Sequence, residues 1–429
     1  MIFFRFIITI LFLILIYAVY RSEIYWLGSN RSYYLIYYIG ILLAIFFSII
    51  FIYLQVKIQK YIIIVFISTI LALYFFELKL IFNKKKNNEN FDRRTKFEVY
   101  KDLKKLNPNI TLNVSPHNFI SFNKDLLSLG GISYAETIHC NENGYYSIYQ
   151  SDRYGFNNPD TEWDSKEIEY LLVGDSFTHG RCVNRPNDIG SVLRHYSKGK
   201  VLNLGQEGNG PLIELATLRE YIMPNIKNVL WLYYEGNDLH DLQFELKNEI
   251  LNKYLTNQNF KQDLKFKQTQ IDQFLTTFLE REIERQEKFY SSEIIKFIKL
   301  FYVRNLLFPA PPLPLNLVTE ELVIQEVAPP PPELKVILNL ANKLAGSYNA
   351  KLYFIYLPQI ERYPKSIKLD YKQQIKKIVI DLDIEFIDID EEVFQKENNP
   401  LKLFPFEKYG HYNIEGYKKV ALKVYERTK

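Results

Sequence analysis

The 429-residue sequence has little cysteine, with only Cys140 and Cys182. Two cysteines exclude a disulfide-rich scaffold, because small domains of that class depend on several bridges. The two residues could pair in an oxidising compartment, but one pair does not decide the compartment. His139 and Cys140 are adjacent and lack the spaced partners that zinc requires, so the sequence predicts no metal site and no cofactor.

Strong charge of one sign is also missing. Lysine and arginine number 53 and aspartate and glutamate 49, which gives a formal net charge of only +4. Nucleic-acid binding needs basic residues gathered on one face, and the sequence indicates no such face. A glycine loop at Gly205, Gly208 and Gly210 lacks the lysine of a P-loop, so binding of nucleotide phosphates is disfavoured.

Long apolar runs occur only near the N-terminus. Ile2–Tyr20, Tyr33–Leu54 and Tyr61–Phe76 are long enough, or nearly so, to cross a bilayer core that needs about 20 helical residues. Only Arg5 is charged within them. The first run has no cleavage site of a signal peptide and is interpreted as a retained anchor. We therefore expect residues 1–86 to form a membrane region with about three transmembrane helices, in a multi-pass protein of the cell membrane.

The charges around these runs give conflicting indications of sidedness. With three spans, Arg21, Arg31 and the Lys84–Arg94 cluster share a side with the rest of the chain, and Lys57 and Lys60 lie opposite. The positive-inside tendency then places the C-terminal region in the cytoplasm. With two spans the sides are exchanged.

The remaining chain divides into a lead-in and a main domain. Residues 87–166 are polar and irregular, with turn signals. Residues 167–429 form the main domain, interrupted at about 242–334 by a helical and proline-rich insertion. Its proline runs favour stiff extended backbone. The insertion is expected to be a cap over the site or a contact surface for a protein partner.

Within the main domain, short apolar runs alternate with helical patterns. This order is typical of parallel strands joined by crossover helices. The sequence therefore predicts a three-layer α/β sandwich with a parallel sheet, of flavodoxin-like type. The predicted strands are EYLLVGD (169–175), KVLNLGQ (200–206), NVLWLYYEG (228–236), KLYFIYLP (351–358) and IEFIDID (384–390), and the predicted helices include Ile189–Tyr196, PLIELATLREYI (211–222), Glu333–Leu344, Asp370–Ile380 and Ile414–Arg427.

Polar, glycine-bearing segments follow the first three of these strands. In an open parallel sheet, ligands bind beyond the carboxyl ends of the strands. The segments are GDS (174–176), NLGQEGNG (203–210) and EGND (235–238). Each has an ordinary structural interpretation as well, since serine or aspartate after a strand often caps a helix and glycines often make turns.

The segment near the C-terminus favours chemistry over capping. His411 stands in a glycine-bearing loop directly before the last predicted helix. A serine nucleophile needs a base to take its proton, and the oxyanion formed on attack needs fixed donors. Serine, donors and base all occur in this chain.

The blocks GDSF, NLGQEG, EGND and GHYNIEGY, in this order, resemble those of the SGNH, or GDSL-like, hydrolase superfamily. The resemblance covers roughly Glu167 to Lys429 except the insertion. Each block is weak alone, whereas four in order at predicted strand ends are a strong indication.

The resemblance implies roles for four residues. Ser176 would be the nucleophile, with its own N–H as one oxyanion donor. Gly208 would supply a second donor through its N–H, and Asn237 a third through its side-chain amide. His411 would be the general base.

One position departs from the family pattern. The family has aspartate three residues before the histidine, where this chain has Lys408. Glu407 is adjacent, and Asp388 or Asp390 could reach His411 in space, but none is a family position. We therefore expect a Ser–His dyad in which a backbone group orients His411.

Three further residues are auxiliary candidates at the site: Asp175, Glu407 and His179. Asp175 precedes the nucleophile. His179 follows it by three residues and could line the pocket, although packing or capping is the commoner role for such a position.

The function expected is that of a membrane-anchored serine esterase acting on acyl esters through an acyl-serine intermediate. The resemblance implies O-acetyl groups of cell-surface polysaccharide, which favours an extracytoplasmic domain against the lysine count. Two alternatives stay open. One is an acyltransferase, in which a sugar hydroxyl replaces water, and the other is an inactive domain that holds a glycan or a partner.

Overall fold

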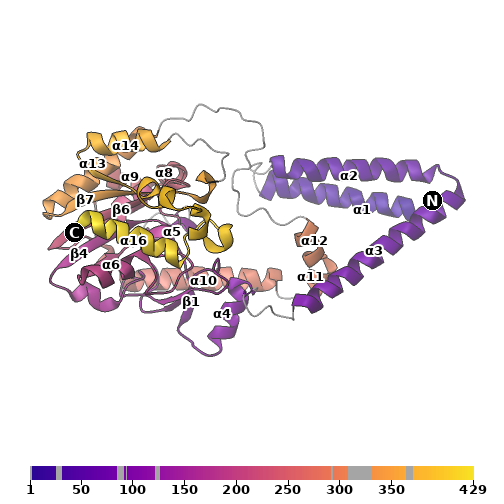
Figure 1. Ribbon diagram of the computed structural model, residues 1–429. Coiled ribbons are helices and arrows are strands. Elements are labelled where there is room, and N and C mark those ends of the chain that lie inside the picture. Colours follow the sequence, from indigo (N-terminus) through magenta and orange to yellow (C-terminus); the bar gives the residue numbers. More distant parts are fainter. Residues whose placement is uncertain are drawn as a thin grey trace. The chain divides into compact units, whose positions relative to one another are not determined.

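The computed structural model describes residues 2–25, 31–84, 91–92, 94–120, 126–290, 293–307, 330–363 and 371–429. The chain forms two compact units (Figure 1). Met1–Lys86 and Ser292–Leu317 make the first, which we call the apolar helical unit. Asn87–Ser291 and Val318–Lys429 make the second, which we call the α/β unit. Residues 308–329, which hold most of the predicted proline-rich stretch, lie outside the described residues, as do Lys85, Lys86 and Arg93 of the predicted basic cluster.

The apolar helical unit confirms that all three apolar runs are helical. They form α1 (Ile2–Val19), α2 (Arg31–Ile52) and α3 (Val56–Lys84), with a turn of π-helix at Tyr20–Tyr25 after α1. The ring centroids of Phe4 in α1 and Phe51 in α2 lie 5.7 Å apart.

Only one helix among the described residues, Val56–Phe82, is long and apolar enough to cross a membrane. Phe3–Val19 and Tyr37–Ile52 are apolar but shorter. Of the three spans predicted from the sequence, the third is thus the one with both the length and the composition of a membrane span.

The α/β unit is built on a five-stranded sheet whose paired strands are all parallel. In spatial order its strands are β5 (Val201–Asn203), β4 (Ile168–Gly174), β6 (Ile226–Tyr234), β7 (Lys351–Leu357) and β8 (Glu385–Asp388). All five were predicted from the sequence. Parallel strands of this kind are buried on both faces, which is why they are nearly continuous apolar runs.

Each face of the sheet has its own hydrophobic core, because neighbouring residues in a strand point to opposite faces. Leu171 and Val173 of β4 belong to one core and Tyr170 and Leu172 to the other. The first core is covered by α7 (Pro211–Tyr221), α13 (Pro332–Ser347) and α14 (Tyr371–Asp381), and the second by α6 (Ile189–Ser197), α15 (Ile389–Glu392) and α16 (Ile414–Thr428). The prediction of a three-layer α/β sandwich is therefore confirmed.

The predicted lead-in contains regular structure. Helix α4 (Lys96–Lys104) is followed by a small sheet of β1 (Ile110–Leu112), β2 (Glu136–Ile138) and β3 (Ile148–Gln150). β1 and β2 are parallel, and β2 and β3 are antiparallel. Short 3₁₀ turns complete the unit at Pro116–Asn118, Asp160–Asp164, Leu264–Phe266, Ile360–Arg362, Phe394–Lys396, Pro400–Leu403 and Pro405–Glu407.

The predicted insertion is divided between the two units. Helices α8 (Asp238–Glu245), α9 (Glu249–Thr256) and α10 (Gln268–Tyr290) bury apolar residues in the first core of the α/β unit. Helices α11 (Glu293–Ile298) and α12 (Phe301–Leu307) belong to the apolar helical unit. Helices α8 to α10 of the insertion are thus packed against the core of the α/β unit.

Candidate active site

Ser176 lies at the sharp turn between β4 and α5 (Ser176–His179). The turn needs glycine at 174, since a Cβ there would lie 2.0 Å from Thr178 Oγ1 and 2.7 Å from the carbonyl oxygen of Leu232. Asp175 is the helix cap, and its Oδ1 accepts a hydrogen bond from Phe177 N at 2.8 Å. The capping role is therefore filled by Asp175. Its other oxygen, Oδ2, lies 3.2 Å from the Ser176 hydroxyl, which can donate to it.

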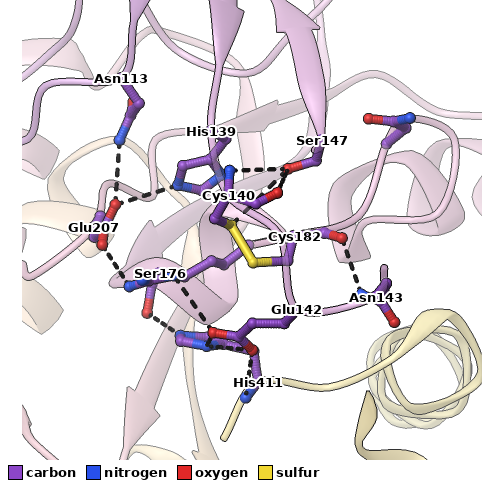
Figure 2. Close-up of a disulfide and its surroundings, with 12 residues drawn as sticks. Asn113, His139, Cys140, Glu142, Asn143, Ser147, Ser176, Cys182, Glu207 and His411 are labelled. Atoms are coloured by element: carbon purple, nitrogen blue, oxygen red, sulfur yellow. Dashed lines mark hydrogen bonds and ion pairs between the residues drawn. A yellow bond between two sulfur atoms is a disulfide. The ribbon is translucent and has the colours of Figure 1, made fainter. Parts of the chain in front are cut away.

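His411 brings an imidazole to that hydroxyl. Its Nε2 lies 2.9 Å from Ser176 Oγ across 235 residues of sequence (Figure 2). The loop is fixed by its neighbours, because buried Tyr412 donates its hydroxyl to the carbonyl of Pro358 at 2.7 Å and Asn413 caps α16. The structure therefore brings together the two residues predicted as nucleophile and base.

A third residue, which the sequence did not indicate, completes the chain of hydrogen bonds. Glu142 Oε1 lies 2.9 Å from His411 Nδ1, and its Oε2 accepts the backbone N–H of His411 at 3.3 Å (Figure 2). Burial raises the pKa of Glu142, but the charge and hydrogen bonds of His411 and the nearby Arg181 lower it more, to about 2. Glu142 is therefore ionised at neutral pH.

The ionised carboxylate selects the tautomer of the neutral imidazole. A carboxylate can only accept, so His411 Nδ1 carries the hydrogen and Nε2 is left to accept from Ser176. This is the arrangement of a serine, a base and an orienting acid. The side chains of His411 and Glu142 are 14% and 16% exposed, so water screens the pair only in part.

The disulfide between Cys140 and Cys182 holds Glu142 in place (Figure 2). Cys140 is two residues before Glu142, and Cys182 is six residues after Ser176. Asn143 adds a second tie, because its Nδ2 donates to the carbonyl oxygen of Cys182 at 2.9 Å. The disulfide thus links Glu142 and Ser176 by a covalent path that is shorter than the chain between them.

The acids named as candidate partners of His411 are placed elsewhere. Glu407 is exposed and accepts a hydrogen bond from Asn399 at 3.2 Å. Asp388 and Asp390 pair with Lys372 at 2.7 Å and 3.1 Å. The expectation that a backbone group orients His411 is therefore wrong in this structure, because a carboxylate from the lead-in has that place.

Lys408, at the family's acid position, is exposed. Its side chain is thus free to face solvent rather than the Ser176–His411 pair.

The other predicted residues, Gly208 and Asn237, follow the strands on either side of β4. Gly208 has a φ of +74°, which only glycine adopts readily, and a Cβ there would lie 3.0 Å from His117 Cβ. Asn237 precedes α8, and its Nδ2 donates to Asp241 Oδ2 at 2.7 Å. An amide nitrogen has two hydrogens, and this bond uses one of those of Asn237.

The role of Asn237 as an oxyanion donor is tested by two substitutions. We expect Asn237→Ala to lower kcat by about 10²–10³, the usual effect of losing one such donor. Asn237→Ser, which keeps a small polar side chain at the N-cap position but not the reach of the amide, should lower kcat as much. Steady-state kinetics on a chromogenic ester measure both. Recovery of kcat in the serine variant would show that Asn237 serves only the helix.

His179, a predicted auxiliary residue, is the last residue of α5, and its ring packs against His139 and Tyr149. It is fully buried, and its ring centroid lies 4.3 Å from that of His139 and 4.8 Å from that of Tyr149. Neither ring nitrogen of His179 has a hydrogen-bond partner among the described residues. Burial lowers the pKa of both histidines, that of His139 to about 4. The two buried rings pack against each other, and His139 Nε2 lies 3.4 Å from Glu207 Oε2 (Figure 2).

This burial predicts a pH-dependent contribution to stability. An unfolded histidine binds a proton below about pH 6.5, whereas folded His139 does so only near pH 4. The unfolded state binds more protons in between, so lowering the pH destabilises the fold. Relative to the wild-type chain, His139→Phe should gain on the order of 1–3 kcal/mol between pH 7 and 4.5.

Denaturant unfolding at several pH values measures this gain. His195→Phe is the control, because it removes an exposed histidine and leaves the buried pair unchanged. Equal pH dependence in both variants would contradict the assignment.

No group of three or more His, Cys, Asp or Glu residues in the described part of the chain is arranged to hold a metal ion.

Comparisons with known proteins give limited information. No protein-family model and no curated protein matches the sequence. A solved structure from Desulfitobacterium hafniense, described as a lipolytic protein of the G-D-S-L family, is similar with a TM-score of 0.29 and 13% identity, over 61% of this chain and 100% of that one. The Bacillus subtilis protein YXIM has a TM-score of 0.32 and 13% identity, over 60% of this chain and 55% of that one. At these values the function has to be inferred from the residues of this chain.

Proposed function

We propose that this protein is a membrane-anchored serine esterase that hydrolyses acyl esters through an acyl-serine intermediate. The observation that carries the proposal is the hydrogen-bonded series from Glu142 through His411 to Ser176, with two contacts of 2.9 Å. Its order on the chain is also that of the SGNH hydrolase blocks in the sequence, apart from the acid.

The reaction follows from this geometry in balanced steps. Ser176 Oγ attacks the ester carbonyl carbon while its proton passes to His411 Nε2, and an oxyanion forms. The N–H groups of Ser176 and Gly208 and the amide of Asn237 are the proposed donors to that oxyanion. The bond to the leaving alkoxide then breaks, and the imidazolium returns the proton to it. In the second half of the reaction, His411 takes a proton from water, and the water oxygen attacks the acyl carbon. The bond to Ser176 Oγ then breaks, the proton returns to Oγ, and the carboxylic acid is released.

Glu142 supports an active enzyme over an inactive binding domain. The sequence has Lys408 where the family that it resembles has aspartate, and this difference favoured the alternative of an inactive domain. A carboxylate at 2.9 Å from His411 Nδ1 supplies the missing charge from another part of the chain. A domain that only binds has no need of it.

The location that we propose is the outer side of a cell membrane. Helix α3 has the length and composition for anchoring the chain, and α1 and α2 are proposed as further spans. The Cys140–Cys182 pair supports an oxidising compartment for the α/β unit, since disulfides are rare in the cytoplasm. O-acetyl esters of surface polysaccharide are the substrate class that the family resemblance suggests, and a sugar hydroxyl in place of water would give an acyltransferase.

The test is covalent capture of the nucleophile in the purified full-length chain. A fluorophosphonate should add one adduct, found by mass spectrometry on the peptide with Ser176, and should stop hydrolysis of a short-chain chromogenic ester in parallel. Ser176→Ala is the control and should neither react nor turn over. A folded wild-type chain with no adduct and no turnover would contradict the proposal.

A further inference from the structure

Two short helices of the insertion, α11 and α12, belong to the apolar helical unit and pack on α3. Among the described residues of α3, Glu77 is the only buried carboxylate, and it contacts α12. Glu77 is fully buried, and its oxygens accept the backbone N–H groups of Tyr302 at 2.9 Å and Val303 at 2.7 Å. Tyr302 and Val303 are in the first turn of α12, where such groups have no partner within the helix. Glu77 thus caps α12.

A second contact fixes α11 next to it. Tyr74 donates its hydroxyl to the carbonyl oxygen of Ile298 at 2.9 Å, and its ring centroid lies 5.0 Å from that of Phe297. Tyr74 and Glu77 are less than one turn apart on α3. Both short helices are therefore attached to one level of that helix.

That level corresponds to a membrane surface if α3 spans. The candidate span runs from Val56 to Phe82, and about 20 helical residues fill the hydrocarbon core. Within this helix the uncharged run Tyr61–Phe76 lies between Lys60 and Glu77, so Tyr74 and Glu77 stand at one end of the run, at the boundary with the headgroups. Tyrosine is enriched there, and a carboxylate is far less costly there than in the bilayer centre.

The side chains of the attached helices suit the same boundary. Ile298 and Leu306 are 61% and 58% exposed, which is a poor arrangement in water for large apolar side chains. Lys299 and Arg304 are exposed beside them. A helix in the interfacial plane combines apolar residues that enter the acyl region with basic residues at the phosphates.

We propose that α11 and α12 lie in the lipid headgroup layer and form a second membrane contact of the chain, in addition to the helices of the N-terminal region. The partner is the lipid surface, with Ile298 and Leu306 inserted beneath the headgroups. The inference depends on the proposed span of α3 and not on the esterase activity.

Depth-dependent fluorescence quenching in proteoliposomes tests the proposal. Single cysteines replace Ile298, Leu306, Val65 or Phe266 in the full chain and carry a bimane label. Phosphatidylcholine vesicles contain a nitroxide either near the headgroup or near the chain end. Val65, 64% exposed in α3, is the control for the span, and Phe266, 91% exposed in the α/β unit, is the matched exposed apolar control.

Labels at 298 and 306 should be quenched at least about twofold more by the shallow nitroxide than by the deep one, as expected for burial of about 5–10 Å. The label at 65 should be quenched more by the deep nitroxide, and that at 266 by neither. Quenching at 65 but not at 298 and 306 would overturn the inference and leave the anchor intact. No quenching at 65 would overturn the anchor and the inference together. If the labels at 298 and 306 are shielded from aqueous iodide but are quenched by neither nitroxide, the inference is overturned. Ile298 and Leu306 would then be covered by a second protein surface instead.

Discussion

Replacing Glu142 by glutamine is expected to lower kcat by about 10³–10⁴ with little change in KM. Glutamine has nearly the same shape and can still accept from His411 Nδ1, but it has no charge with which to stabilise the imidazolium. Because that cation exists only after the proton leaves Ser176, the loss falls on the chemical step. Steady-state kinetics with a chromogenic ester give both parameters.

The control is Glu407→Gln, which removes the exposed acid next to the family position and should leave kcat unchanged. Glu142→Asp, which keeps the charge but shortens the side chain, should recover part of the lost rate. A Glu142→Gln enzyme with wild-type kcat would show that the carboxylate seen at 2.9 Å from His411 is only a structural partner.

Removal of the disulfide is expected to lower both stability and turnover. Cys140 and Cys182 are 42 residues apart. In the loop-entropy description, closing a loop of that length lowers the entropy of the unfolded chain, which raises its free energy by about 4 kcal/mol at 25 °C. The double variant Cys140→Ala with Cys182→Ala should therefore lose on the order of 2–4 kcal/mol in denaturant unfolding.

Its turnover should fall because the loop that holds Glu142 is released. A double-mutant cycle separates this effect from the loss of stability. Under conditions in which both chains are folded, removing the disulfide in the Glu142→Gln background should change kcat by less than about threefold, since the carboxylate is already gone. Full additivity of the two losses would mean that the disulfide acts on the site by another route.

The sequence predicted the sheet because its strands have a strong pattern. Five apolar runs of strand length, each followed by a helical segment, became β4 to β8 in the expected parallel arrangement. Ser176 was found for a related reason, since residues at the carboxyl ends of such strands share one edge of the sheet. His411 was found from its glycine-bearing loop before the last helix and from the family resemblance, and the structure places its Nε2 2.9 Å from Ser176 Oγ.

Glu142 could not be found in the same way. It precedes the first strand of the sheet, it lies 269 residues before His411, and no strand end or motif marks it. The available signal was indirect: pairing of the only two cysteines places the segment HCNENG (139–144) against the turn of the nucleophile. The pairing itself depends on three-dimensional proximity, which two cysteines in a sequence do not reveal.

The helices of the insertion show a different limit. Their charged, helical texture was visible, but their division between two units depends on tertiary contacts such as those of Glu77 with the first turn of α12. Among the described residues, the three apolar runs gave one helix with both the length and the composition of a membrane span.

The separation of the reacting groups along the chain also has a consequence for biosynthesis. Ser176 and His411 are 235 residues apart, and ribosomes add about 5–20 residues per second. A growing chain therefore carries its serine for roughly 10–50 s before the base has been made. During that time the nascent chain has Ser176 and Glu142 but not His411, so the hydrogen-bonded series of the site can form only after the base has been added.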